Sequence, residues 1–237
     1  MNGWIVVPCY NEEKRLPAEV FADFMKRHEK ITFLFVNDGS TDDTGHVLQK
    51  LCAGCNNAKL LELSENCGKA EAVRQGMLRA AGSKARFIGF CDADGATPLE
   101  EFIDMLSLSR ESTLMISGCR FLRLGGRIKR SPLRHFIGRI FATAASMYLD
   151  LPVYDTQCGA KLYASETVAA VFDKPFVTRW FFDVEILDRL ILIYGKDRIM
   201  QDCFEYPLHC WEDKSGSKIR LGAVLKDFIR LLFSRRK

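Results

Sequence analysis

Four short apolar runs alternate with helical patterns over the first 91 residues, and this alternation restricts the possible folds more than any other feature of the chain. The runs occupy residues 4–7, 31–36, 60–63 and 86–91. Helical patterns lie between them: from residue 11 to about 28, after a cap at Ser40 or Thr41, and from residues 67–70 to near Gly82. Strands that alternate with helices in this way build a doubly wound sheet. The sequence therefore predicts an α/β fold in which helices flank a mostly parallel sheet.

Polar residues follow each apolar run, where the strand is expected to end. They are Tyr10, Asn11 and Glu12 after the first run, Asn37 and Asp38 after the second, Asn66 and Lys69 after the third, and Asp92 and Asp94 after the fourth. In sheets of this kind, ligands bind at the carboxyl ends of the strands. We therefore expect the four clusters to converge on one edge of the sheet and to form a binding site.

Asp92 and Asp94 stand one residue apart after the fourth run. If the strand continued through them, their side chains would point to the same face, since side chains alternate along a strand. Two neighbouring carboxylates raise each other's pKa unless a cation lies between them, and a divalent metal with oxygen ligands meets that need. A solvated turn is the alternative for this pair considered alone.

The other polar clusters suit the remaining parts of a nucleotide-sugar. Asp38 and Glu12 can accept hydrogen bonds from a base or from sugar hydroxyls. Lys69, beside a glycine and a helix N-terminus, suits a phosphate, and a metal at Asp92 and Asp94 would neutralise a diphosphate. The chain contains neither G-x-G-x-x-G nor G-x-x-x-x-G-K-[ST], which argues against a dinucleotide-binding dehydrogenase and against a P-loop NTPase.

Length and composition limit the class of protein further. A chain of 237 residues that is 48% hydrophobic and 27% charged fits one large globular domain, and its net charge of +4 gives no reason to expect nucleic-acid binding. Nine scattered cysteines, an odd number, fit reduced thiols in a cytoplasmic protein. No stretch approaches the ~20 consecutive apolar residues of a transmembrane helix, so we expect the chain not to cross a membrane.

Eight short motifs are spread over nearly the whole chain. The first half contains VVPCYNEEKRLP, FVNDGSTDDT, NCGKAEAVRQGM and FCDADGAT. The second half contains SGCR (117–120), DTQCGAKLY (155–163), WFFDVEIL (180–187) and GSK (216–218). The first four resemble the motifs of inverting family 2 glycosyltransferases, which have the GT-A nucleotide-sugar-binding fold with a Rossmann-like sheet. With the second four, the chain resembles the polyprenyl-phosphate glycosyltransferases, most closely the dolichyl-phosphate β-glucosyltransferase branch.

This resemblance implies roles for the donor-side residues. Uracil and ribose would be held by Pro8, Tyr10, Glu12 and Asp38. Lys69 would approach the diphosphate, and Asp92 and Asp94 would bind the donor and a Mg²⁺ or Mn²⁺ ion. The mannosyl branch has glutamine where Ala96 stands, so the glucosyl branch is favoured and the third protein ligand of the metal is not identified. Asn37 replaces the first aspartate of the usual DDGS, which leaves the role of that carboxylate open.

The resemblance also implies an acceptor side. Arg120 and Arg134 match the arginines that grip the acceptor phosphate in this family, and Asp155 would orient the sugar or these cations. Lys218 could close over either phosphate group. Asp183 and Glu185 fall on a predicted helix, where a helix N-terminal charge and a solvated face are the alternative to a site role.

Two segments predict amphipathic helices. The apolar residues of segment 136–148 have helical spacing, and we expect a mixture of core packing and lipid contact. Residues 219–237, which follow a catalytic domain over residues 1–218, combine an apolar stripe with the basic end Arg235-Arg236-Lys237. We predict that this tail holds the protein on the cytoplasmic face of a membrane. Docking onto the catalytic domain is the alternative.

The predicted function is transfer of a hexose, with glucose favoured, from a UDP-sugar to a polyprenyl phosphate, by an inverting displacement that gives a β-linked product. Two alternatives stay open at this point. The acceptor could be a growing surface glycan, or the protein could be a catalytically idle nucleotide-sugar-binding module.

Overall fold

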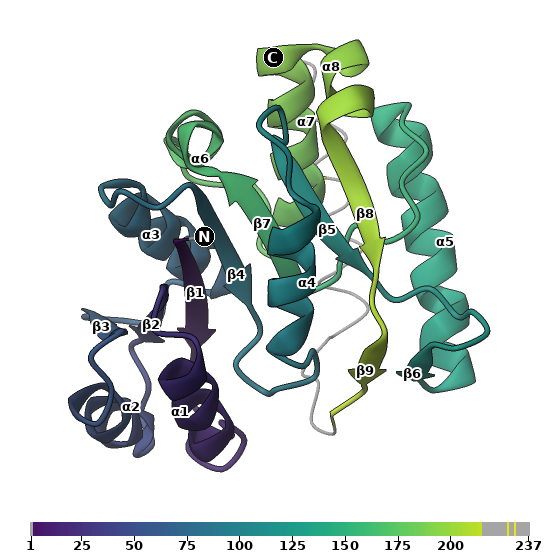
Figure 1. The fold of residues 1–237 in the computed structure, drawn as a ribbon. Coiled ribbons are helices and arrows are strands. Elements are labelled where there is room, and N and C mark those ends of the chain that lie inside the picture. Colours follow the sequence, from purple (N-terminus) through teal and green to yellow (C-terminus); the bar gives the residue numbers. More distant parts are fainter. Residues whose placement is uncertain (1, 215–226, 228–229, 231–237) are drawn as a thin grey trace.

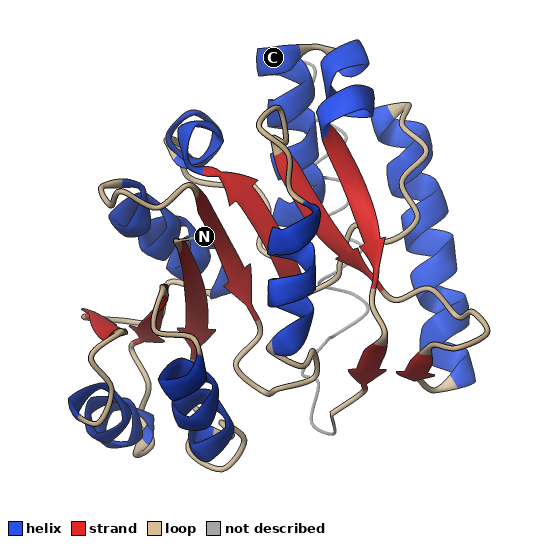
Figure 2. Ribbon diagram, viewed as in Figure 1, coloured by secondary structure: helices blue, strands red, loops and turns tan. Residues whose placement is uncertain are grey.

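The structure is a computed structural model that describes residues 2–214, 227 and 230. Within this part, one seven-stranded sheet runs through the centre of the molecule (Figures 1 and 2). Its strands are β1 (Gly3–Cys9), β2 (Ile31–Asp38), β3 (Ala58–Leu63), β4 (Phe87–Cys91), β5 (Met115–Cys119), β7 (Ala160–Ala164) and β8 (Cys203–Pro207). Their order is β3-β2-β1-β4-β7-β5-β8, and only β7 runs antiparallel to its neighbours. The predicted α/β fold with a mostly parallel sheet is confirmed.

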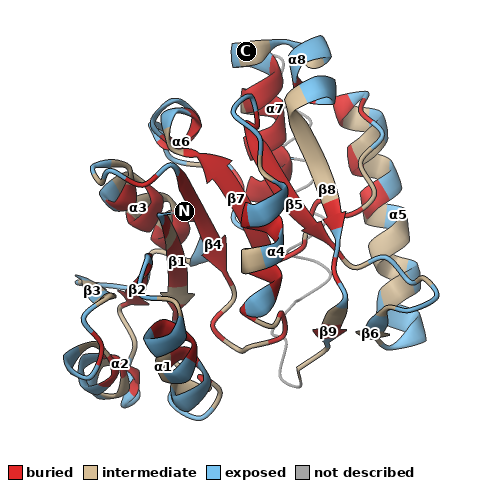
Figure 3. Ribbon diagram, in the orientation of Figure 1, coloured by how far each residue is buried: buried red, intermediate tan, exposed pale blue. Residues whose placement is uncertain are grey.

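Helices cover both faces of the sheet, and the sheet separates the core into two apolar clusters. On one face lie α1 (Ala18–Arg27), α2 (Thr44–Ala53) and α4 (Glu100–Leu108); on the other lie α3 (Lys69–Ala81), α6 (Ser165–Phe172) and α7 (Phe182–Tyr194). The central strands are buried (Figure 3). The remaining helices are α5 (Pro132–Leu149) and α8 (Lys196–Asp202).

The helix α3 packs closely against the sheet because its inner face includes small residues. Ala72, Ala80 and Gly76 are buried on this face. A Cβ atom added to Gly76 would overlap the side chains of Val6 and Val36, so the backbone itself packs against β1 and β2. This close packing fixes the N-terminus of α3, and with it Lys69, at the carboxyl edge of the sheet.

A long segment leaves the sheet at the carboxyl edge after β5 and returns at the same edge, where the antiparallel strand β7 begins. Residue Cys119 ends β5 at the carboxyl edge, and the chain re-enters the sheet at Ala160, the first residue of β7. Between them lie the short strand β6 (Arg127–Lys129) and α5. The strand β6 pairs in parallel with β9 (Cys210–Glu212), which follows β8. We call this two-stranded sheet the β6–β9 ribbon.

Three local predictions are wrong. The first helix begins at Ala18 and not at residue 11, because Asn11 has a left-handed φ of 52° and the chain turns before Pro17. Neither Ser40 nor Thr41 caps α2, whose N-cap is Asp43. Finally, β4 ends at Cys91, so Asp92 and Asp94 lie in the turn after the strand and not on a common strand face.

The segment 136–148 shows the expected mixture of buried and exposed residues. Phe141 and Tyr148 are partly buried and pack against the core, whereas Phe136, Ile140 and Met147 are exposed. Lipid contact stays a prediction. No helix in the described ranges is long and apolar enough to span a bilayer.

Most of the predicted tail helix 219–237, and the domain boundary at residue 218, fall outside the described residues. Asp227 is described, and its carboxylate is buried. It accepts hydrogen bonds from the backbone N–H groups of Arg179 and Trp180, both at 2.8 Å. Asp227 therefore lies against the loop before α7.

Candidate active site

Lys69 and Asp92 form an ion pair at the carboxyl edge of the sheet. Lys69 is the first residue of α3, and its Nζ donates to Oδ1 of Asp92. Burial alone would raise the pKa of the Asp92 carboxyl, but the Lys69 ammonium outweighs burial and holds the pKa below its ordinary value. Asp92 is therefore an anion fixed at the end of β4, next to a helix N-terminus.

A glycine makes room for the Asp92 carboxylate. The register pairs Cys91 of β4 with Ala160 of β7, so Gly159 lies beside Asp92. A Cβ atom on Gly159 would overlap all three atoms of the Asp92 carboxylate. Any side chain at this position would displace the carboxylate, which explains why the DTQCGAKLY motif has glycine here.

Asp94 is held from the opposite side of the turn. Its Oδ2 accepts a hydrogen bond from Nη2 of Arg15 at 2.9 Å, and its Oδ1 accepts one from the backbone N–H of Ala96 at 3.1 Å. Nη1 of Arg15 also donates to Glu12 at 3.2 Å. Arg15 thus links Glu12, which was predicted to bind the nucleoside of the sugar donor, to Asp94, a predicted metal ligand. Sequence reasoning missed it because residue 15 was assigned to a helix.

The two aspartates fit a divalent cation. Burial and then the neighbouring Asp92 raise the pKa of the Asp94 carboxyl, and positive charge close to both carboxylates would reverse this. Carboxylate oxygens are the donors that Mg²⁺ and Mn²⁺ prefer. Among residues 2–214, 227 and 230, no group of three or more histidine, cysteine or acidic side chains could hold a metal.

Asp38 fixes the loop that leads into α3. Its carboxylate accepts hydrogen bonds from the N–H groups of Cys67 at 2.8 Å and Gly68 at 2.9 Å, and from the side chain of Asn66 at 3.1 Å. Burial raises the pKa of Asp38, although these hydrogen bonds oppose the shift. Asp38 is thus close to Lys69 through this loop.

The other predicted donor residues lie on or after β1. Pro8 is partly buried within the strand, and Tyr10 is exposed on the loop that follows. The backbone N–H of Glu12 donates to Thr44 at the start of α2, at 2.8 Å. The structure therefore brings Pro8, Tyr10 and Glu12 to the same edge as Asp38.

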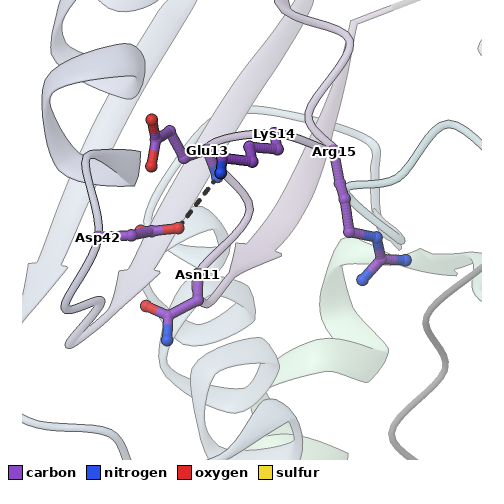
Figure 4. A pocket seen from close by; sticks show the side chains of 5 residues that line it. All are labelled: Asn11, Glu13, Lys14, Arg15 and Asp42. Carbon is purple, nitrogen blue, oxygen red and sulfur yellow. Dashed lines mark hydrogen bonds between the residues drawn. The ribbon is translucent and has the colours of Figure 1, made fainter.

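An open cavity of about 400 Å³ lies beside this loop. Its lining consists of Asn11, Glu13, Lys14, Arg15 and Asp42 (Figure 4). Asp42 accepts a hydrogen bond from the backbone N–H of Glu13 at 3.3 Å, while the Arg15 side chain extends away from Asp42. None of the predicted uracil- and ribose-binding residues lines this cavity.

Arg120 and Asp155 form a buried bidentate pair. Nε and Nη2 of Arg120 donate to the two carboxylate oxygens of Asp155 at 2.7 and 2.8 Å. Burial would raise the pKa of Asp155, but the Arg120 guanidinium holds it far below its ordinary value. Glu205, which the sequence did not indicate, accepts hydrogen bonds from the backbone N–H groups of Tyr154 and Asp155 and so fixes the pair on β8.

Arg134 lies in the first turn of α5, and its Nη1 donates to Oδ1 of Asp213 at 2.5 Å. The guanidinium of Arg120 lies 5.2 Å from the ring centroid of Trp211, in the strand that precedes Asp213. The two arginines that were predicted to grip an acceptor phosphate are thus both anchored near β9. Lys218 lies outside the described residues.

A second charged pair is buried beneath the site. Nζ of Lys161 in β7 donates to Asp183 at 2.7 Å, and burial raises the pKa of Asp183 although Lys161 opposes the shift. Glu185 is also buried and accepts hydrogen bonds from the N–H groups of Val177 and Thr178. The solvated-face interpretation of Asp183 and Glu185 is therefore wrong. Lys161 also helps to lower the pKa of Asp92, so the pair belongs to the electrostatics of the site.

Comparison with known proteins places the chain among enzymes. The sequence profile of the family described as Glycosyl transferase family 2 matches residues 4–172. A dolichyl-phosphate beta-glucosyltransferase from Trichomonas vaginalis is 31% identical over 96% of this chain and 68% of its own length. The Drosophila melanogaster protein of the same name is 35% identical over 91% of this chain and 68% of its own length.

Solved structures share the fold. Glucosyl-3-phosphoglycerate synthase from Mycobacterium tuberculosis, in complex with UDP, has a TM-score of 0.72 and 17% identity, over 99% of this chain and 79% of its own. The same enzyme with Mn²⁺ and UDP-glucose has a TM-score of 0.70 and 17% identity, over 99% of this chain and 78% of its own.

Proposed function

Because this chain belongs to glycosyl transferase family 2, we propose that it transfers glucose from UDP-glucose to a polyprenyl phosphate such as dolichyl phosphate. The relatives named for this reaction cover nearly the whole chain, and they support hexosyl transfer to a lipid phosphate. The observation that carries the proposal is the meeting of two charge systems at one sheet edge. Asp92, Asp94 and Lys69 suit a metal-bound diphosphate, and Arg120 with its neighbours suits a second phosphate.

The donor side would stabilise the leaving group. Asp92 and Asp94 would hold Mg²⁺ or Mn²⁺, which when bound supplies positive charge for the diphosphate. Lys69 lies at the N-terminus of α3, where the helix dipole also favours an anion. Asp38 would keep the loop before α3 in place while Pro8, Tyr10 and Glu12 contact the nucleoside.

The acceptor side would position the nucleophile. A phosphate oxygen of the acceptor attacks the anomeric carbon, the bond from that carbon to the UDP oxygen breaks, and UDP leaves with the electron pair. A phosphate monoester is already an anion, so it needs no strong general base. The protein must instead hold two anionic molecules close together, which arginines do well because they bind phosphate in a bidentate manner. Inversion at a UDP-α-sugar gives the β-linked product.

The test is direct. The pure protein with Mn²⁺, labelled UDP-glucose and a polyprenyl phosphate is expected to form a lipid-linked glucoside, and a donor screen should favour UDP-glucose over other UDP- and GDP-hexoses. Product found only on an oligosaccharide acceptor would instead make the protein a glycan-extending enzyme. UDP-glucose binding without turnover on either acceptor would make it a binding module.

We also propose that the protein rests on the cytoplasmic face of an anionic membrane, where its water-insoluble acceptor resides. Residues 120–149 contain seven arginine or lysine residues and no aspartate or glutamate. The same stretch exposes apolar side chains next to Arg120 and along α5: Phe121, Leu122, Leu124, Leu133, Phe136, Ile140 and Met147. Leu124 is fully exposed, at 100%. Apolar side chains with surrounding cations suit an anionic lipid surface.

The double variant Leu124→Ser, Phe136→Ser is expected to reduce sedimentation with anionic liposomes about tenfold or more, because each buried apolar side chain contributes roughly 1.5–3 kcal/mol. Transfer to a short, soluble prenyl phosphate should be unchanged. Leu192→Ser, at a position on α7 that is 73% exposed, is the matched control. Equal liposome binding by both variants and by the unmodified chain would place the membrane contact elsewhere, for example on the tail.

A further inference from the structure

Three arginines lie on the acceptor side of the site, and they differ in what holds them. Arg120 is paired with Asp155, and Arg134 is paired with Asp213. Arg130, which lies between them in the sequence, makes no hydrogen bond or ion pair with any residue in the part of the chain that the structure describes. Among the described residues, the Arg130 guanidinium is thus the only one of the three without a hydrogen-bond partner.

The β6–β9 ribbon places Arg130 beside Arg120. Ile128 of β6 pairs with Trp211 of β9, and the guanidinium of Arg120 lies over the ring of Trp211. Arg130 leaves the ribbon immediately after β6 and is partly buried. Burial and then the Arg120 cation lower the pKa of Arg130, although the Asp155 and Asp213 carboxylates oppose the shift, which agrees with this proximity. Two like charges close together favour an anion between them.

The Arg130 guanidinium packs against the backbone of α5 at Gly138. A Cβ atom on Gly138 would lie 2.5 Å from Nη2, 3.1 Å from Cζ and 3.2 Å from Nη1 of Arg130. Glycine inside a helix is destabilising relative to alanine, so its use here calls for a local reason. The close approach of the guanidinium to the helix backbone is such a reason.

We propose that Arg130 binds the phosphate group of the acceptor, together with the Nη1 group of Arg120, which takes no part in the pair with Asp155. This inference rests on the proposed lipid-phosphate acceptor. Asp155 and Asp213 hold Arg120 and Arg134 in place, while Arg130, which has no such partner among the described residues, can donate to the incoming phosphate. Gly138 is the positioning residue that allows Arg130 to lie there.

Two variants test this by different means. Arg130→Ala removes the donors, and Gly138→Ala keeps them but displaces the guanidinium. Both are expected to raise the KM for a short, soluble prenyl phosphate roughly 10- to 100-fold, as for loss of a charge-assisted hydrogen bond, with little change in UDP affinity by calorimetry. Arg130→Lys should restore part of the loss. Arg127→Ala, in exposed β6, is the matched control.

Direct binding of the short prenyl phosphate to the UDP-bound protein, measured by calorimetry, separates the possible outcomes. Weaker binding by Arg130→Ala and Gly138→Ala, with unchanged melting temperatures, supports the proposal. Unchanged binding overturns it, and so does a loss confined to UDP affinity or to liposome sedimentation, because Arg130 would then serve the donor or lipid headgroups. If the unmodified protein binds the prenyl phosphate but transfers nothing to it, the proposed function fails and the Arg130 site still stands.

Discussion

Replacement of Asp94 by asparagine is expected to lower kcat/KM for glucosyl transfer by roughly 10²- to 10³-fold, the usual cost of removing one group that stabilises developing charge. Asparagine keeps the shape of the side chain and can still accept from Ala96, so the turn after β4 should persist. What is lost is the negative charge next to Asp92, where the proposed metal would bind, and with it the ion pair that Asp94 makes with Arg15. Removal of divalent metal with EDTA should abolish turnover in the unmodified enzyme, and Mn²⁺ should restore it.

Binding of Mn²⁺, followed by electron paramagnetic resonance with UDP present, provides a readout that does not depend on turnover. Asp94→Asn is expected to weaken it. Asp23→Asn is a matched control because Asp23 lies on α1 with an exposed carboxylate. Full turnover in EDTA by the unmodified protein would rule out the metal role of both aspartates.

Gly159→Ala is expected to be almost as damaging, although it adds a single methyl group at a position that sequence reasoning did not assign. The new Cβ would occupy the space of the Asp92 carboxylate, which must then turn away from Lys69. A displacement of about 1 Å in an active site can cost about 10²-fold in rate. We expect kcat to fall by about that factor and metal-dependent UDP binding to weaken.

Thermal melting distinguishes this explanation from simple misfolding. The Asp92 side chain can rotate, so the melting temperature of Gly159→Ala should stay within a few degrees of that of the unmodified chain. Gly82→Ala, at the end of α3 with an ordinary φ of −71°, is the control and should be active. Normal activity of Gly159→Ala would show that the position of the Asp92 carboxylate is not critical.

The first half of the fold could be predicted because its signals are local. Each parallel strand is a short apolar run that is followed by turn residues, and the runs are separated by helical patterns. The strands β5, β7 and β8 carry the same kind of residues, but their order depends on pairing between distant segments. An antiparallel β7 inserted between β4 and β5 has no local signature. The early start predicted for α1 failed for another reason, since Asn11 and Pro17 impose a turn there.

The residues of the candidate site also fall into those that local sequence motifs predict and those that only the tertiary structure reveals. Motifs marked Lys69, Asp92, Arg120 and Asp155, and the structure pairs these residues with one another. The residues that were missed act across long sequence separations. Arg15 contacts Asp94 from 79 residues away, and Glu205 fixes Asp155 from 50 residues away. Gly159 acts by having no side chain, which no charge pattern can reveal.

The segment from Arg120 to Gly159 leaves the sheet after β5 and returns in β7 at the same edge, with its two ends side by side. The ion pair between Arg120 and Asp155 joins the two ends of the segment. Glu205 of β8 accepts a hydrogen bond from the backbone N–H of Asp155 and so holds this pair against β8. These contacts therefore hold both ends of the segment at the carboxyl edge of the sheet. The predicted donor-side residues lie in or after β1, β2 and β4 and at the start of α3, whereas Arg120, Arg134 and Asp155 all belong to this one segment.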